Sequence, residues 1–139
     1  MKLYVREPGT DRLLQLVNLV ENRFAVLSLS QVEFRSAIRR RERAGDIDPN
    51  AASMLLDRFQ QHQESRFLRQ VLTDAVLDGA SEMIDRYALR AYDAIQLAAC
   101  LELKFTVSME PLIFVCSDQQ LLAAAHSELL STLDPCVTN

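Results

Sequence analysis

The sequence predicts an α/β fold, a three-layer α/β/α sandwich with a mainly parallel sheet. Two continuous apolar runs, residues 24–29 and 112–116, are typical of strands that are buried on both faces. Segments with apolar residues at helical spacing precede, separate and follow these runs. Strands that alternate with helices indicate βαβ units, in which helices cover both faces of a parallel sheet.

The first half of the chain is expected to alternate in this way. A turn at residues 6–9 leads into a helix that Thr10 is predicted to cap, with Val20 among its inward residues. After the first apolar run, Ser30 opens a helix that should end near Gly45. Pro49 is well placed to start the next helix. A short strand is expected at residues 67–72.

The second half repeats the alternation. Thr73 or Asp74 is expected to cap a helix, and residues 89–101 form a further helix that is apolar around most of its circumference. The second apolar run follows as a strand. A helix then opens at Ser117–Asp118, and a brief last strand is expected at residues 132–133.

Length and composition favour one domain, residues 1–139, because the chain is long enough to bury a core. No apolar run approaches the roughly 20 residues that cross a bilayer, and no signal-peptide pattern opens the chain. A cytoplasmic location is therefore expected. Cys100, Cys116 and Cys136 fit no zinc-binding spacing and are interpreted as buried free thiols in a reducing compartment. His62 and His126 have no nucleophile or ligand at suitable spacing and are expected to be solvent-exposed.

The formal net charge of −4 excludes a global basic field that would attract nucleic acid. Basic charge is local instead, and it is concentrated on one predicted helix by Arg35, Arg39, Arg40, Arg41 and Arg43. This face is interpreted either as a solvated helix surface or as a contact surface for phosphate or for an acidic partner.

Three carboxylates form the candidate site. Glu33 and Asp118 each follow a predicted strand, and Asp93 lies on the apolar helix at residues 89–101. Ligands gather beyond the carboxyl ends of parallel strands, so these side chains are expected to converge there. Converging carboxylates repel each other unless a cation lies between them, and Mg²⁺ prefers such oxygen ligands. A bound divalent ion would lower the pKa of a water and stabilise charge in phosphodiester hydrolysis.

Each carboxylate also has a purely structural interpretation. Ser30 and Glu33 match a capping box, with Ser30 at the N-cap and Glu33 three residues later. Asp118 is placed to cap a helix, or to favour its dipole beside an N-cap Ser117. Asp93 has Arg90 three residues earlier as an ion-pair partner. These alternatives stay open at the level of the sequence.

Four segments in order resemble the PIN-domain ribonucleases, in particular the VapC-type toxins of bacterial toxin–antitoxin pairs. They are residues 2–9, 28–33, 89–99 and 114–122. The resemblance implies a PIN-like sandwich and a Mg²⁺- or Mn²⁺-dependent endoribonuclease. It also implies an RNA substrate, a homodimer and a cognate antitoxin that blocks the site.

The same resemblance assigns roles to residues. Glu33, Asp93 and Asp118 fall on the family's second, third and fourth acidic positions, which makes them the implied catalytic and metal-binding residues. Ser30 falls on a small hydroxyl residue that precedes the glutamate, and Ser117 is given a supporting role beside Asp118.

The resemblance also predicts that a segment is missing. Family members begin with a strand that carries the first metal-binding aspartate, shortly before the segment that matches residues 2–9. The first strand is therefore expected to be missing, so that the chain is an N-terminally truncated PIN-like domain. Three explanations are a start codon placed too late, a natural remnant without nuclease activity, and a strand supplied by another chain.

Three functions compete at this stage. The first is the metal-dependent ribonuclease. The second is a catalytically inactive PIN-like binding module of a toxin–antitoxin system. The third is a receiver-like phosphotransfer domain, which needs a lysine after a late strand; Lys104 follows a helix instead, which counts against it.

Overall fold

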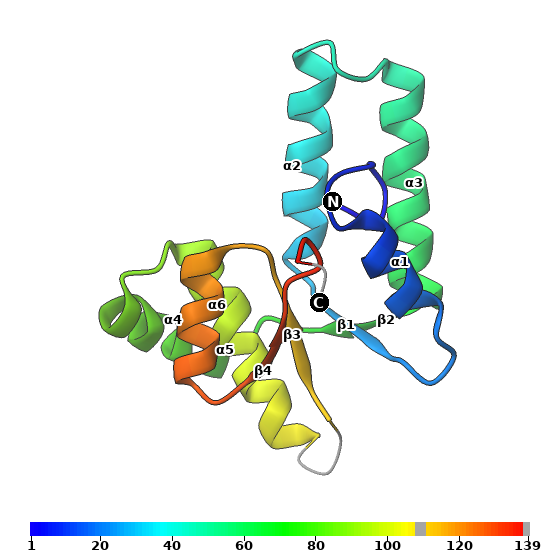
Figure 1. Cartoon of the computed structure of the whole chain (residues 1–139). Helices are drawn as coiled ribbons and strands as arrows, with labels where there is room; N and C mark the ends of the chain where they lie inside the picture. Colours follow the sequence, from blue (N-terminus) through cyan, green and yellow to red (C-terminus); the bar gives the residue numbers. More distant parts are fainter. Residues whose placement is uncertain (108–110, 138–139) are drawn as a thin grey trace. The chain divides into compact units, whose positions relative to one another are not determined.

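The structure is a computed structural model that describes residues 1–107 and 111–137. The chain forms two compact units, Met1–Val71 and Leu72–Asn139 (Figure 1). Both units combine helices with short parallel strands, which confirms the predicted α/β class.

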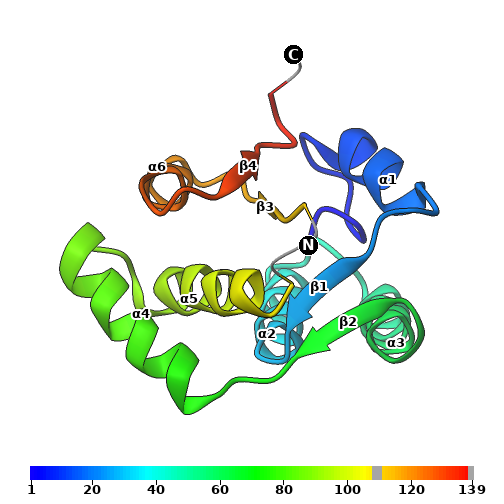
Figure 2. The ribbon, with the colours of Figure 1, turned by 90° about the horizontal axis from the view of Figure 1, so that it is seen from below.

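The first unit contains α1 (Thr10–Asn18), β1 (Phe24–Leu27), α2 (Ser30–Arg43), α3 (Pro49–Ser65) and β2 (Phe67–Gln70). Strands β1 and β2 pair in parallel and lie side by side in Figure 2, with Phe24 opposite Phe67. The ladder continues one residue past β1, because the Ser28 amide donates to the Gln70 carbonyl at 2.8 Å. Helices α2 and α3 pack against each other as an antiparallel pair.

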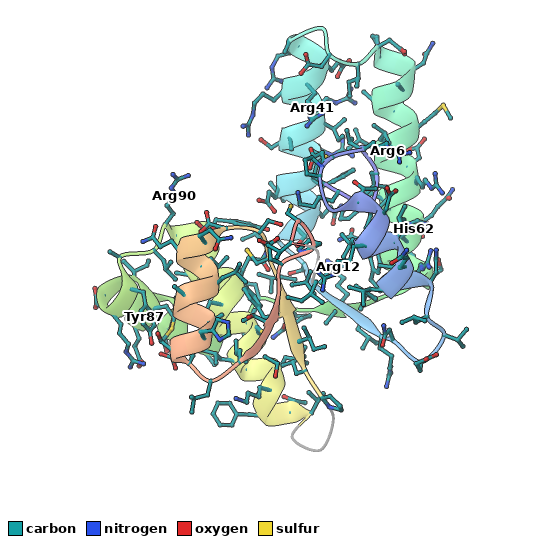
Figure 3. The ribbon with its side chains drawn as sticks, viewed as in Figure 1. Arg6, Arg12, Arg41, His62, Tyr87 and Arg90 are labelled. Carbon is teal, nitrogen blue, oxygen red and sulfur yellow. The ribbon has the colours of Figure 1, made fainter. Side chains whose placement is uncertain are left out.

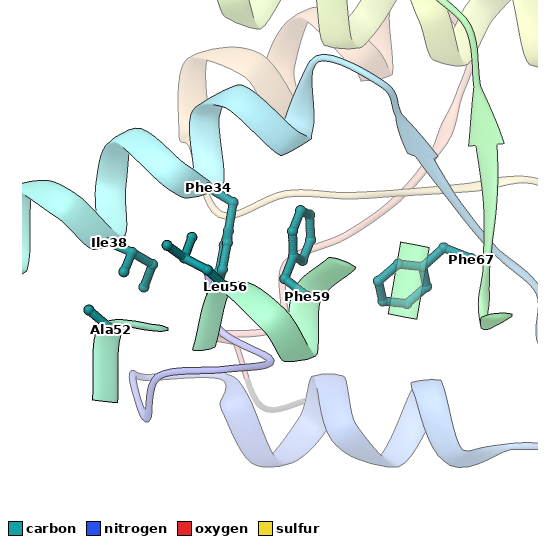
Figure 4. Close-up of a cluster of buried hydrophobic side chains, with 6 residues drawn as sticks. All are labelled: Phe34, Ile38, Ala52, Leu56, Phe59 and Phe67. Carbon is teal, nitrogen blue, oxygen red and sulfur yellow. The ribbon is translucent and has the colours of Figure 1, made fainter. Parts of the chain in front are cut away.

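An aromatic and aliphatic cluster holds the first unit together. Its buried members are Phe34, Ile38, Ala52, Leu56, Phe59 and Phe67 (Figure 4). Phe34 stacks on Phe59 with ring centroids 4.3 Å apart, and Tyr4 meets both rings edge-on. Burying each large side chain stabilises the fold by about 1.5–3 kcal/mol. Helical spacing explains the cluster, since Phe34 and Ile38 are four residues apart on one face of α2.

Two helix caps considered for the first unit are not formed. Gly9, in the left-handed conformation at φ 88°, is the N-cap of α1 rather than Thr10. The Thr10 hydroxyl is drawn away, because it donates to the Lys2 carbonyl at 2.9 Å. Val20 lies beyond the end of α1 and is 98% exposed instead of facing inward. Helix α2 opens at Ser30, as predicted, but its N-cap is Leu29 and no side-chain hydrogen bond caps it, so the alternative of a capping box at Ser30 and Glu33 is wrong.

Other boundaries of the first unit were predicted correctly. Asp48 caps α3 by accepting from the Ala51 amide at 2.9 Å, and Pro49 is the first helical residue, as expected. Helix α2 stops at Arg43, and Gly45 follows with φ 79°, a conformation that glycine adopts without strain.

The second unit contains α4 (Asp74–Tyr87), α5 (Ala91–Thr106), β3 (Ile113–Val115), α6 (Gln119–Ser127) and β4 (Ser131–Leu133). Strands β3 and β4 pair in parallel, with Val115 opposite Leu133. Helices α4 and α5 pack closely, and a side chain added at Gly79 would meet the Ala98 Cβ at 3.4 Å. Thr73 caps α4 by accepting from the Val76 amide, as predicted.

The apolar runs are less buried than their composition predicted. Strand β3 is 52% exposed at Ile113 and 37% exposed at Val115, whereas Phe114 is half-buried. Strand β1 does not alternate in this way, but it is not fully buried either: Ala25 is exposed, Phe24 and Val26 are half-buried, and only Leu27 is buried. Neither strand is buried along its whole length, so the prediction of strands buried on both faces was wrong.

Three smaller predictions have mixed outcomes. All three cysteines are free thiols, as expected, but the prediction that they are buried was wrong: Cys100 and Cys116 are half-buried and Cys136 is exposed. His126 is exposed, as predicted. His62 is not: it is half-buried, and its Nδ1 lies 2.8 Å from the Tyr4 hydroxyl, within the aromatic cluster. Every helix that the structure describes is too short or too polar to span a bilayer.

Candidate active site

Two of the three predicted carboxylates belong to the second unit and lie near enough to affect each other's charge. Asp93 lies in the first turn of α5, and Asp118 is the N-cap of α6, at the end of the short connection from β3. The pKa of Asp93 is raised, first because burial disfavours its charge and second because the negative charge of Asp118 lies nearby. The two side chains therefore form an interacting pair.

Asp118 is held in place by the helix that it begins. Its Oδ1 atom accepts a hydrogen bond from the Leu121 amide at 2.9 Å, so the helix-capping interpretation is confirmed. Its Oδ2 atom accepts no hydrogen bond from the residues that the structure describes. One oxygen thus fixes the carboxylate, and the other stays free for a ligand.

Asp93 has no comparable anchor. The ion pair with Arg90 that its spacing suggested is not formed within the described ranges, and the Arg90 side chain projects away from the ribbon (Figure 3). Arg90 acts on Asp93 only at longer range, by opposing the rise in its pKa. The carboxylate is half-buried in the first turn of a helix whose Ala94 and Leu97 are fully buried.

A fourth carboxylate, which the sequence did not single out, follows the strand next to β3. Asp134 follows β4, as Asp118 follows β3, and the parallel pairing brings both to the same end of the strands. The Asp134 carboxylate accepts from the Gln119 amide nitrogen at 3.1 Å and from the backbone amide of Cys136 at 2.9 Å. It therefore ties β4 to the start of α6. Its position after a predicted strand was the signal that would have found it.

The supporting serines have different surroundings. The Ser117 hydroxyl lies 3.4 Å from the Cys136 sulfur and also bonds Asp134, so it belongs to the same connection between β4 and α6. Ser30 is the first residue of α2 in the other unit.

Glu33 also belongs to the first unit, where it lies in the first turn of α2 and is exposed. With Ser30 it lines a cavity of about 270 Å³ whose remaining walls are mainly apolar, including Tyr4, Phe24 and Phe59. The convergence of Glu33 with the other two carboxylates stays a prediction.

The pair in the second unit suits a hard divalent cation. Neither unit brings together three metal-binding side chains among its described residues. Mg²⁺, however, is usually held by one or two carboxylates, with water and substrate phosphate as its other ligands. Asp93 and Asp118 meet that requirement, because they interact with each other and keep unbonded oxygens.

Comparison with known proteins gives the family. A family model described as the PIN domain matches residues 1–126, which is most of the chain. The chain belongs to the PIN domain family. PIN domains are generally nucleases and typically use divalent metal ions, which agrees with a pair of interacting carboxylates at the ends of strands. No curated protein matches this PIN domain in sequence.

Proposed function

We propose that this PIN domain is a Mg²⁺- or Mn²⁺-dependent endoribonuclease of the VapC toxin type, with Glu33, Asp93 and Asp118 as its catalytic carboxylates. One observation carries the proposal: half-buried Asp93 lies near the equally acidic Asp118, and burial first and the charge of Asp118 second raise the pKa of Asp93. A divalent cation offsets such a charge, and it would polarise the phosphate and activate a water for hydrolysis.

The protein's own groups have separate tasks in this proposal. Asp118 presents Oδ2 from a carboxylate that the Leu121 amide already orients. Asp93 presents its carboxylate from the first turn of α5, where the helix dipole favours negative charge. Asp134 and Ser117 keep the start of α6 aligned with the end of β4. Preorganisation of this kind lowers the cost of assembling a site for reaction.

RNA cleavage by the purified chain tests the proposal. We expect cleavage that needs Mg²⁺ or Mn²⁺ and stops with a chelator. Loss of a residue that only supports a metal ligand commonly lowers activity by about 10–100-fold, so Asp93→Asn, which removes a ligand itself, should lower the rate by roughly 100-fold or more. Asp85→Asn is the matched control, since Asp85 is exposed on α4 and makes no bond within the described ranges. Equal rates for the two variants would refute the assignment of Asp93.

Glu33→Gln tests the part of the site that comes from the first unit. If Glu33 completes the metal site, this variant loses cleavage as Asp93→Asn does. Glu64→Gln, an exposed change on α3, is its control. Full activity of Glu33→Gln would remove Glu33 from the catalytic set and leave Asp93 and Asp118.

We further propose a homodimer and a cognate antitoxin as partners, and a cytoplasmic location. Sedimentation of the purified chain measures the first, and copurification with the product of the adjacent gene measures the second. A chain that binds such a partner but cleaves no RNA with either ion would instead be an inactive PIN-like binding module. The coding DNA upstream of Met1 tests the predicted missing strand, because an in-frame aspartate-bearing strand would supply the first acidic position.

A further inference from the structure

The two units of the chain carry opposite charge. Residues 1–71 contain 12 lysines and arginines against 9 acidic residues, whereas residues 72–139 contain 3 against 10. The first unit therefore has a surplus of positive charge, and the second unit, which holds Asp93 and Asp118, is strongly negative. A polyanion approaching the carboxylate pair is repelled by that second unit unless another surface attracts it.

Helix α2 supplies most of the positive surplus, and its arginines form two groups, those with an ion-pair partner among the described residues and those without one. Arg39 pairs with Glu42 and Arg41 pairs with Glu7, each at 2.7 Å. Arg35, Arg40 and Arg43 are exposed and have no hydrogen bond or ion pair within the described ranges. We call these three residues the arginine ridge.

The ridge lies on the solvent side of its helix. Phe34 and Ile38 turn the opposite side of α2 into the core, at 5% and 0% exposure. The ends of the ridge are eight residues apart, which is about 12 Å along a helix. The helix dipole favours Arg40 and Arg43, which lie in the last turn, but it does not explain Arg35. Like charges three residues apart, such as Arg40 and Arg43, destabilise a helix unless an anion joins them.

The chemistry of the ridge selects phosphate. A guanidinium group binds a phosphate through two parallel hydrogen bonds, which an ammonium group does not provide. Every basic residue of the first unit except Lys2 is an arginine. We propose that the arginine ridge binds the phosphodiester backbone of the RNA substrate and holds it to the first unit against the repulsion of the second. This inference rests on the proposed function, because that function makes RNA the polyanion.

Salt-dependent RNA binding tests the ridge. A fluorescent single-stranded RNA of mixed sequence is titrated with the full chain in EDTA, so that binding is measured without cleavage. The test variant combines Arg35→Gln, Arg40→Gln and Arg43→Gln. Each phosphate contact contributes about 0.7 to the slope of log affinity against log salt for a single strand, so loss of three should lower the slope by about 2.

A matched variant separates the ridge from charge in general. It removes the same number of charges from exposed positions of the same unit, Arg23, Arg58 and Arg69. We expect it to keep a clearly steeper slope than the ridge variant. Equal slopes for the two variants, or a ridge variant that binds RNA as the unmodified chain does, would overturn the proposal. Circular dichroism checks that both variants are folded.

Two further outcomes have fixed meanings. If the ridge variant keeps RNA affinity but loses binding to a poly-glutamate probe, the ridge serves an acidic protein and the proposal is wrong. If the chain binds RNA through the ridge but never cleaves it with Mg²⁺ or Mn²⁺, the ridge stands and the proposed nuclease activity fails. Binding in EDTA and cleavage with metal therefore report the two proposals separately.

Discussion

Replacement of Asp118 by asparagine and by alanine separates its two roles. The Asp118 Oδ1 atom caps α6 through the Leu121 amide at 2.9 Å, and the proposed metal site needs the negative charge of the same carboxylate. Asparagine is as good an N-cap as aspartate but carries no charge, whereas alanine neither caps nor carries charge. Both variants should lose RNA cleavage, but only Asp118→Ala should lose stability.

The size of the stability effect follows from the single capping bond. Loss of an N-cap costs about 1 kcal/mol, within a range of about 0.5–2 kcal/mol. With a urea dependence of about 2 kcal/mol per molar, the unfolding midpoint of Asp118→Ala should fall by roughly 0.5 M. The midpoint of Asp118→Asn should stay unchanged or rise slightly, because the repulsion with Asp93 is removed as well.

Urea unfolding followed by circular dichroism in EDTA measures both midpoints, and RNA cleavage with Mg²⁺ measures both activities. Carboxyl NMR adds a direct check, because the pKa of Asp93 should be lower in either variant than in the unmodified chain. An active Asp118→Asn variant would refute the metal-ligand role. Equal destabilisation of the two variants would refute the capping account, and an unchanged Asp93 pKa would refute the proximity of the pair.

Three other predictions follow from single contacts. Asp93→Asn should stabilise the metal-free chain at neutral pH, because ionised Asp93 lowers the stability of the fold once the pH rises through its raised pKa. Urea unfolding at pH 7 should show a higher midpoint for the variant, and an unchanged or lower midpoint would contradict the prediction. Leu97→Ala should destabilise the second unit by about 2–5 kcal/mol, since Leu97 is fully buried, whereas the exposed Leu77→Ala on α4 should cost far less. His62 should titrate below 6.5 in proton NMR, because burial and the nearby arginines lower its pKa. The folded state favours neutral His62, so this contribution to stability is lost as the pH falls through the lowered pKa. A His62 pKa above 6.5 would contradict the prediction.

The parts of the fold that could be predicted from the sequence depend on contacts between residues that are only a few positions apart. Thr73 and Asp118 each cap the helix that follows, because a short polar side chain needs only the amide three residues later. Thr10 has the same local chemistry but a distant competitor, the Lys2 carbonyl, that takes its hydroxyl. No pattern within a few residues of Thr10 indicates that contact.

The same distinction explains the candidate site. Asp118 was identifiable because it directly follows an apolar run, and Asp93 because it interrupts an apolar helix. Asp134 was missed because its bond to Gln119 depends on the parallel pairing of β3 with β4, which the sequence indicated only as a brief last strand. His62 was misjudged for a similar reason, since its partner Tyr4 is 58 residues away.

Helix capping and metal binding by Asp118 are compatible, and the state of Asp93 favours their combination. A carboxylate in the first turn of a helix normally gains from the helix dipole, which should lower its pKa. The pKa of Asp93 is raised instead, so burial and the charge of Asp118 together outweigh the dipole of α5. Capping alone would not require a second carboxylate beside Asp118. The N-termini of α5 and α6 do not fully offset the negative charge of Asp93 and Asp118. A bound divalent cation would neutralise the remainder.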